Sequence, residues 1–173
     1  GHDLRPGLPV VRRLASALTA MAVAVTLSPA AHADDNATTE ACSWVHTDEA
    51  AVFLEGPATA EPSRTQLPEL SCAYRVLDGP VGGRSLLSDV RFADAFPWDA
   101  ATTFKEVAAW PGATEVDGVG LRAVCTYEPN VTPPSTTLTV LLTGERIYRV
   151  TGSYVWRCET LKTFVELAIA RIG

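Results

Sequence analysis

The sequence predicts an α+β domain in which a mainly antiparallel sheet of about five strands is covered by helices and held by two disulfides. Three observations predict it. Segments in which apolar and polar side chains alternate are joined by short turns, and segments with a helical repeat lie before, between and after them. Four cysteines follow an N-terminal export signal.

The first 33 residues have the features of a cleaved secretion signal. Arginines at 12–13 precede an apolar run over 14–27, and Ala31-His32-Ala33 matches a small-residue cleavage pattern. Because that run is shorter than the ~20 residues needed to span a bilayer, we expect cleavage after Ala33 and no membrane span. A lipid anchor would need cysteine where the chain has Asp34. General secretion is the favoured route, and twin-arginine export is the alternative.

The net charge of the mature chain limits the kinds of molecule that we expect it to bind. Residues 1–33 hold three of the 14 basic and one of the 20 acidic residues, so the mature chain has 11 basic and 19 acidic residues, a net charge of −8. This balance disfavours nucleic acids and anionic membranes as partners. The excess of arginine over lysine and the abundant alanine favour a high-GC bacterial source.

The first half of the mature chain begins with a polar stretch, 34–41, which we expect to be flexible. A single disulfide-stapled domain is expected over 42–173, about the length of one domain with a hydrophobic core. Thr47 is predicted to cap a short helix that ends at Gly56-Pro57. Residues 57–68 contain three prolines and are predicted to be loop. Alternating side chains then predict strands over 70–77 and 86–92.

The second half begins with a helical repeat from Trp98 that ends at Pro111-Gly112. Residues 121–127 alternate as a strand, entered through an Asp-Gly-Val-Gly turn. Two further strands, 136–143 and 146–154, flank a short Gly-Glu connection and predict a hairpin. A final helix is expected from about residue 158.

The cysteines, Cys42, Cys72, Cys125 and Cys158, allow three disulfide pairings. We favour Cys42–Cys72 and Cys125–Cys158, because each bridge then fixes a helix start to a strand within its own half of the chain. A redox role is disfavoured, since the sequence has no C-x-x-C motif.

The residue inventory disfavours several kinds of chemistry. Cleavage leaves His46 as the one histidine, so a Ser-His-Asp triad is disfavoured, and neither a metal site nor a cofactor is expected. We expect His46 to flank the first helix. Carboxylates remain for a small hydrolase: Asp48 and Glu49, Asp94 and Asp99, and Glu115 with Asp117.

Tryptophans flank the ends of the predicted helices, at Trp44, Trp98, Trp110 and Trp156. They are either core residues or the lining of a groove for an apolar or glycan ligand. The candidate groove comprises Phe96, Trp98 and Trp110, because Phe96-Pro97-Trp98 places two aromatic rings around a proline at a helix start.

Three segments carry a family resemblance. Cys42 with the helix that ends at Leu54-Glu55-Gly56, Ser71-Cys72-Ala73-Tyr74, and VDGVGLRA at 116–123 resemble an uncharacterised family of actinobacterial secreted proteins and envelope lipoproteins. Related modules include the extracellular sensor domain of a mycobacterial serine/threonine kinase and lipoproteins with a PsbP-like fold. The resemblance implies a non-enzymatic extracytoplasmic module that binds a ligand or a protein.

These observations predict a secreted, monomeric, non-enzymatic binding or interaction protein of the cell envelope, whose partner is a protein or an apolar or glycan ligand. A secreted protease inhibitor is the alternative, with 128–136 or 57–68 as its reactive loop. A small carboxylate-based hydrolase is a further alternative.

Overall fold

The computed structural model describes residues 40–63, 70–80, 83–92, 98–154 and 156–173. The predicted signal, and the predicted flexible segment as far as residue 39, lie outside these residues. Ala31–Gly173 form a compact unit, and its described part is α+β, as the sequence predicts.

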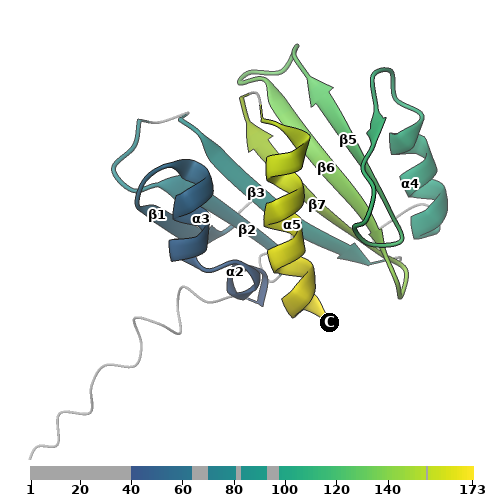
Figure 1. Ribbon diagram of the computed structural model, residues 1–173, viewed down its shortest axis with the longest axis horizontal. Helices are drawn as coiled ribbons and strands as arrows, with labels where there is room; N and C mark the ends of the chain where they lie inside the picture. The colour runs from purple at the N-terminus through teal and green to yellow at the C-terminus, as the bar shows by residue number, and fades with distance from the viewer. Residues whose placement is uncertain (1–39, 64–69, 81–82, 93–97, 155) are drawn as a thin grey trace, which may run out of the picture. The chain divides into compact units, whose positions relative to one another are not determined.

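An antiparallel sheet organises the described residues (Figure 1). Its strand order is β1-β2-β3-β7-β6-β5-β4, and all neighbours run antiparallel. The strands are β1 (Ala58–Pro62), β2 (Ser71–Val76), β3 (Ser85–Phe92), β4 (Thr114–Glu115), β5 (Arg122–Glu128), β6 (Ser135–Leu142) and β7 (Arg146–Ser153). The described part of the sheet therefore has seven strands, and our expectation of about five was too low.

The prolines of residues 57–68 predict a loop, but residues 58–62 form the edge strand β1. Ser63 N–H donates to the Ser71 carbonyl and Leu77 N–H to the Pro57 carbonyl. Successive residues of a strand point their N–H and C=O groups toward opposite sides of that strand. The nitrogen of Pro62 therefore faces the free edge of the sheet. A missing N–H there removes no bond between strands, which is why proline is tolerated in edge strands. The other missed strand, β4, has only two residues.

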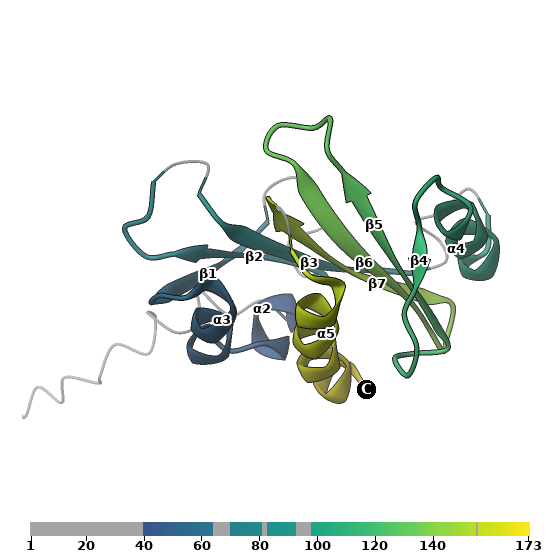
Figure 2. The same ribbon diagram turned by 45° about the horizontal axis from the view of Figure 1, so that its top comes forward.

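Helices lie on both faces of the sheet (Figures 1 and 2). The described helices are α2 (Glu40–Trp44), α3 (Thr47–Leu54), α4 (Ala100–Ala108) and α5 (Cys158–Ile172). Tyr148 and Val150 of β7 belong to the core beneath α2, α3 and α5, whereas Ile147 packs under α4. Because side chains alternate along a strand, α4 covers the opposite face. The described residues contain no helix of the length and apolarity that a membrane crossing requires.

Helix starts differ slightly from the prediction. The cap of α3 is His46, not Thr47, and its N–H donates to the Glu49 carboxylate at 2.9 Å. Asp99 caps α4 by accepting a hydrogen bond from Thr102 N–H at 2.7 Å. Glu40, in the segment expected to be flexible, begins α2, whose five residues are too few for a helical repeat to be recognised.

The main core lies between the sheet and the trio of α2, α3 and α5. Phe164 of α5 is fully buried at its centre. Its ring meets Phe53 and Tyr74 edge-to-face, with centroids 5.4 and 5.6 Å apart. Trp44 meets Tyr148 in the same way at 6.1 Å. These aromatic contacts hold the helices against β2 and β7.

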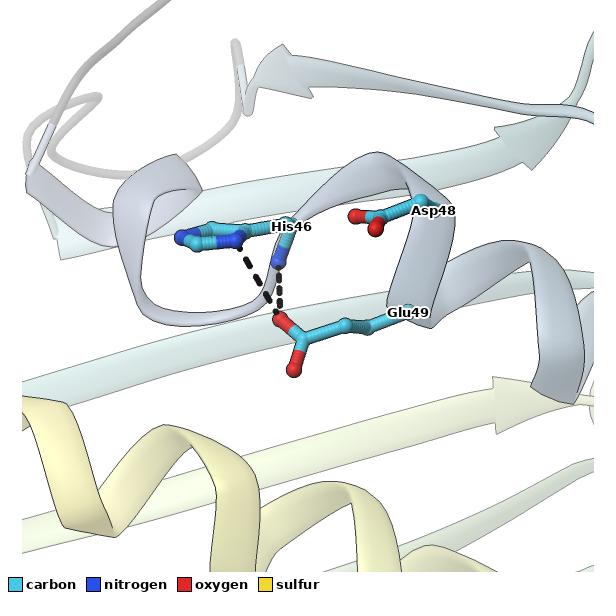
Figure 3. A group of neighbouring side chains, drawn as sticks. All are labelled: His46, Asp48 and Glu49. Atoms are coloured by element: carbon cyan, nitrogen blue, oxygen red, sulfur yellow. Dashed lines mark hydrogen bonds and ion pairs between the residues drawn. The ribbon is translucent and has the colours of Figure 1, made fainter.

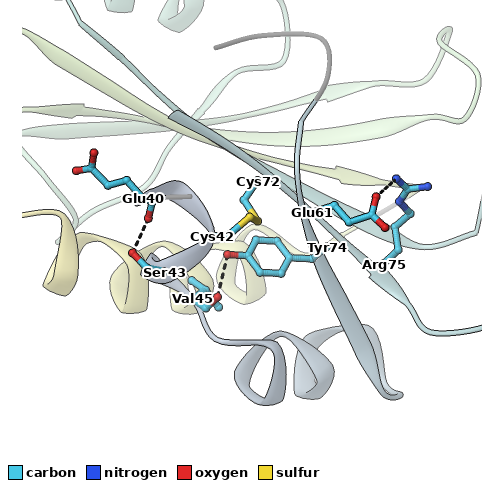
Figure 4. Close-up of a disulfide and its surroundings, with 8 residues drawn as sticks. All are labelled: Glu40, Cys42, Ser43, Val45, Glu61, Cys72, Tyr74 and Arg75. Carbon is cyan, nitrogen blue, oxygen red and sulfur yellow. Dashed lines mark hydrogen bonds and ion pairs between the residues drawn. A yellow bond between two sulfur atoms is a disulfide. The ribbon is translucent and has the colours of Figure 1, made fainter. Parts of the chain in front are cut away.

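Both disulfides join a helix to a strand. Cys42 of α2 is bonded to Cys72 of β2, and Cys125 of β5 to Cys158 at the start of α5; these are the pairings favoured from the sequence. Close to the first bridge, the Tyr74 hydroxyl donates to the Val45 carbonyl at 2.9 Å (Figure 4). Desolvation in this buried position raises the pKa of Tyr74 well above its ordinary value.

Candidate functional site

One group of metal-ligand side chains occurs in the described residues, at the start of α3. Ligand atoms of His46, Asp48 and Glu49 lie within 4.8 Å of one another (Figure 3). Both oxygens of Glu49, however, accept hydrogen bonds from Arg171 of α5, at 2.6 and 2.9 Å. Arg171 also donates to the Trp44 carbonyl at 2.7 Å. We therefore assign the group to capping α3 and joining it to the last turn of α5.

Replacing Glu49 by glutamine should lower the free energy of unfolding by about 1–2 kcal/mol at neutral pH. The Arg171 hydrogen bonds, followed by the His46 N–H, hold the pKa of Glu49 at about 2, below its ordinary 4.5. A carboxylate whose pKa is lower in the folded state than in the unfolded state stabilises the fold at pH values above the unfolded-state pKa. This stabilisation is lost as the pH falls through the folded-state pKa. Denaturant unfolding between pH 5 and pH 2 should therefore show a shallower decline for Glu49→Gln than for the parent.

The matched control for this substitution is Asp48→Asn. Asp48 is an exposed carboxylate in the same helical turn. A pH dependence that Asp48→Asn reduces as strongly as Glu49→Gln would contradict the assignment to the pair with Arg171.

Two of the other carboxylates proposed for hydrolysis, Asp99 and Glu115, have structural partners. Asp99 caps α4, and the Thr102 N–H holds the pKa of Asp99 below its ordinary value. Glu115 is paired with Arg122. Asp117 is exposed, and Asp94 lies outside the described residues. Asp99 and Glu115 are therefore held by other parts of the fold rather than by each other.

The tryptophans divide into two kinds. Trp44 and Trp156 are buried in the main core, while Trp98 is 57% and Trp110 48% exposed. These exposed residues flank the nine-residue α4, so about 13 Å of helix separates them. Phe104 fills the space beneath α4. Neither Trp98 nor Trp110 lines any of the hollows described below; Phe96, the third predicted residue, lies outside the described residues.

A different hollow lies at the end of α5. We call it the α5 groove; it has a volume of about 290 Å³, near the lower end of the range for small-ligand sites. Four aliphatic side chains form most of its wall: Leu121, Leu142, Ile169 and Ile172. The remaining lining residues are Gly120, Thr143, Arg146 and Gly173. The groove thus combines an aliphatic wall with a single charged side chain.

The VDGVG stretch builds one wall of the α5 groove. Val116 and Val119 are buried, so the loop is anchored at two points. Gly120 has φ +60°, and a Cβ there would lie 2.7 Å from the Leu141 carbonyl oxygen and would collide with Val140. Only glycine permits this approach to β6. It lets Leu121 N–H bond to the Leu141 carbonyl and leaves the Leu121 side chain 61% exposed at the groove.

Arg146 is the charged side chain that lines the α5 groove. Its Nε donates to the Thr143 carbonyl at 3.0 Å and its Nη2 to a backbone oxygen of Gly173, the last residue of the sequence, at 2.9 Å. It thereby joins the β6–β7 turn to the end of α5. A guanidinium has five N–H donors, so these bonds leave three for other acceptors.

Sequence reasoning missed this groove. The sequence predicts a simple turn at Gly118-Val119-Gly120, and Ile172, which packs against the main core, also borders the groove. The sequence feature that pointed toward the groove was the pair of glycines around a buried valine. Such a pair indicates a loop that approaches another strand closely. Which strand the loop approaches depends on the order of the strands in the sheet, and the local sequence pattern does not specify that order.

Two further hollows in the described residues are more polar. One, of about 730 Å³, lies on the face of β1, β2 and β3 that carries Thr59, Ala73 and Leu87. The other, of about 600 Å³, lies between α3 and the start of α5, where Arg84 stacks 3.9 Å from the Trp156 ring. Arg75 in the first hollow is paired with Glu61, and Arg84, which lines both, is paired with Glu55.

Comparisons of this chain with protein-family models, with curated proteins and with solved structures found no match.

Proposed function

We propose that this chain is an extracytoplasmic, non-enzymatic binding module of the bacterial envelope, and that it holds an apolar ligand in the α5 groove. The setting follows from the two disulfides, which are typical of proteins that fold in an oxidising compartment. The resemblance to secreted actinobacterial proteins supports the same setting.

The observation that carries the proposal is the aliphatic wall of the groove. Leu121 remains 61% exposed although the loop that bears it is fixed at Gly120. An exposed leucine held in a fixed position beside Ile169 and Ile172 is ready to bury apolar surface without a further ordering cost. Each fully buried aliphatic side chain contributes roughly 1.5–3 kcal/mol.

A neutral apolar dye such as Nile red tests this proposal. We expect fluorescence titration to show saturable binding to residues 34–173, and Leu121→Glu to weaken that binding at least tenfold, about 1.4 kcal/mol. The matched control is Val52→Glu, which places the same charge at another exposed apolar residue, outside the groove. Equal weakening by both substitutions, or saturable binding by neither parent nor control, would contradict the proposal.

A protease inhibitor is a second candidate function, favoured by the connection between β5 and β6. Residues 129–132 are exposed, and this connection begins close to Cys125, which is bridged to α5. Tyr154 N–H also bonds to the Pro134 carbonyl at its other end. Inhibition of a serine protease that is lost on replacing Val131 would support this candidate. Of the other suggested loop, 57–68, residues 58–62 form β1 and 64–69 lie outside the described residues.

A further inference from the structure

The polar residues of the α5 groove are joined to one another. The Arg146 guanidinium donates to the Thr143 carbonyl at 3.0 Å and to a Gly173 backbone oxygen at 2.9 Å. All three residues line the groove, and the other lining side chains are those of two leucines and two isoleucines. The lining is therefore amphipathic, with an aliphatic wall and a polar rim that consists of Thr143, Arg146 and Gly173.

The charges of the polar rim balance in a protein that ends at Gly173. In such a protein the Gly173 oxygen that accepts from Arg146 belongs to the terminal carboxylate. The guanidinium and the carboxylate then form a charge-assisted hydrogen bond and neutralise each other. An anionic head group would meet the carboxylate, and a cationic one would meet the guanidinium. Charge complementarity therefore favours a ligand with an uncharged head group.

The polar rim can still form hydrogen bonds with such a ligand. A guanidinium has five N–H donors, and Arg146 uses two of them for Thr143 and Gly173. No acceptor among the described residues bonds to the other three. Uncharged oxygens of a ligand can accept from these donors, and a ligand hydroxyl can donate to the free lone pairs of Gly173. The rim thus suits a head group with several oxygens.

The aliphatic wall favours an alkyl chain as the apolar part of the ligand. None of the described residues that line the groove is aromatic, so the wall lacks the ring faces on which an aromatic ligand would stack. Leu121, Ile169 and Ile172 instead present branched aliphatic surface, which a flexible chain can follow. The volume of about 290 Å³ lies near the lower end of the range for small-ligand sites, which favours a single chain.

From these features we propose that the ligand of the α5 groove is a single-chain glycerol monoester, a neutral lipid. Its alkyl chain lies against the aliphatic wall, and its ester and hydroxyl oxygens bond to the polar rim. An alkane would leave the donors of Arg146 unused, and free glycerol would leave the wall exposed. The inference rests on the proposed function, because it specifies the ligand of the same groove.

The test displaces Nile red from residues 34–173 with ligands that share a decyl-length chain but differ in head group. The ligands are 1-decanoylglycerol, decanoate and decylammonium, each used below its critical micelle concentration. We expect 1-decanoylglycerol to displace the dye at a concentration about fivefold lower than either charged ligand requires, because each charged head group meets a like charge on the rim.

Variants of the arginine test its hydrogen bonds to the head group. Arg146→Met removes the donors and should weaken 1-decanoylglycerol about fivefold, but 1-decanol, with its single oxygen, by about twofold at most. Arg157→Met is the matched control and should change neither, because Arg157 is exposed at the start of α5 and does not line the groove. Thermal unfolding accompanies each titration. If Arg146→Met unfolds, Arg146→Lys replaces it and should lose part of the affinity, because the planar fork is absent.

Moving the terminal carboxylate tests the charge argument. Extension of the chain by Gly-Ser after Gly173 leaves a neutral carbonyl beside Arg146. We expect decanoate to bind the extended chain about fivefold more tightly than the parent, because the guanidinium then lacks its counterion. Unchanged decanoate binding would show that charge balance does not select the ligand, and would overturn the inference.

The two proposals fail in distinguishable ways. If Nile red does not bind the parent chain, the proposed function fails, and this inference with it. If Nile red binds but 1-decanoylglycerol does not displace it, or if either charged ligand displaces it equally well, the groove keeps its function and the glycerol monoester is overturned. Equal losses from Arg146→Met and Arg157→Met would overturn it as well.

Discussion

Gly120→Ala should lower the free energy of unfolding by about 3 kcal/mol. Part of this cost is conformational, because φ +60° at this position is a left-handed conformation that costs a residue with a Cβ roughly 1–2 kcal/mol. The rest is steric. The new methyl group would lie 2.7 Å from the Leu141 carbonyl oxygen and against Val140, and overpacking of this kind costs roughly 1–3 kcal/mol.

Gly118→Ala is the matched control, since it lies in the same loop with φ +79° but its Cβ would meet only the end of the Lys162 side chain, at 3.6 Å. We expect this variant to lose the conformational part alone, about 1 kcal/mol. Denaturant unfolding of both variants measures the difference. Equal losses would show that Gly120 does not approach β6 as closely as described, and the wall of the groove would then be placed wrongly.

Removal of the disulfide between β5 and α5 should have an effect of similar size. The bridge from Cys125 to Cys158 spans 33 residues, and loop-closure entropy gives about 3–4 kcal/mol for a loop of that length. The double substitution Cys125→Ala/Cys158→Ala should therefore lower the melting temperature by roughly 10 °C. Scanning calorimetry on the oxidised parent and the variant checks this value.

The bridge between α2 and β2 provides the comparison. It spans 30 residues, so the same model predicts nearly the same loss for Cys42→Ala/Cys72→Ala. A loss below about 1 kcal/mol in either variant would contradict the view that each bridge is a structural staple. Native protein with reactive free thiols would contradict it as well.

The fold was predictable where the local pattern determines the structure. The alternation in β2, β3, β5, β6 and β7, and the stripe of α5, each come from a single face packed on a core. Strand β1 was missed because Pro57 and Pro62 indicate a loop unless the strand is known to lie at an edge. Helix α2 was missed because five residues do not complete two turns. Both depend on neighbours that the local sequence does not specify.

The site was less predictable than the fold. Aromatic residues near Trp98 were the conspicuous candidates, yet Phe104 fills the space beneath α4 and leaves Trp98 and Trp110 separately exposed. The α5 groove is formed by residues from the VDGVG loop, the β6–β7 turn and the end of α5, which are separate in sequence.

Amide NMR spectra of residues 34–173 during a titration with Nile red test the central claim most directly. If the α5 groove is the binding site, the largest shift changes will fall on Gly120, Leu121, Thr143 and Ile169, together with the Arg146 side-chain Nε–H. The indole signals of Trp98 and Trp110 will not move. Changes centred on those indoles, or on the hollow over β1–β3, with none at Leu121 and Arg146, would contradict the account.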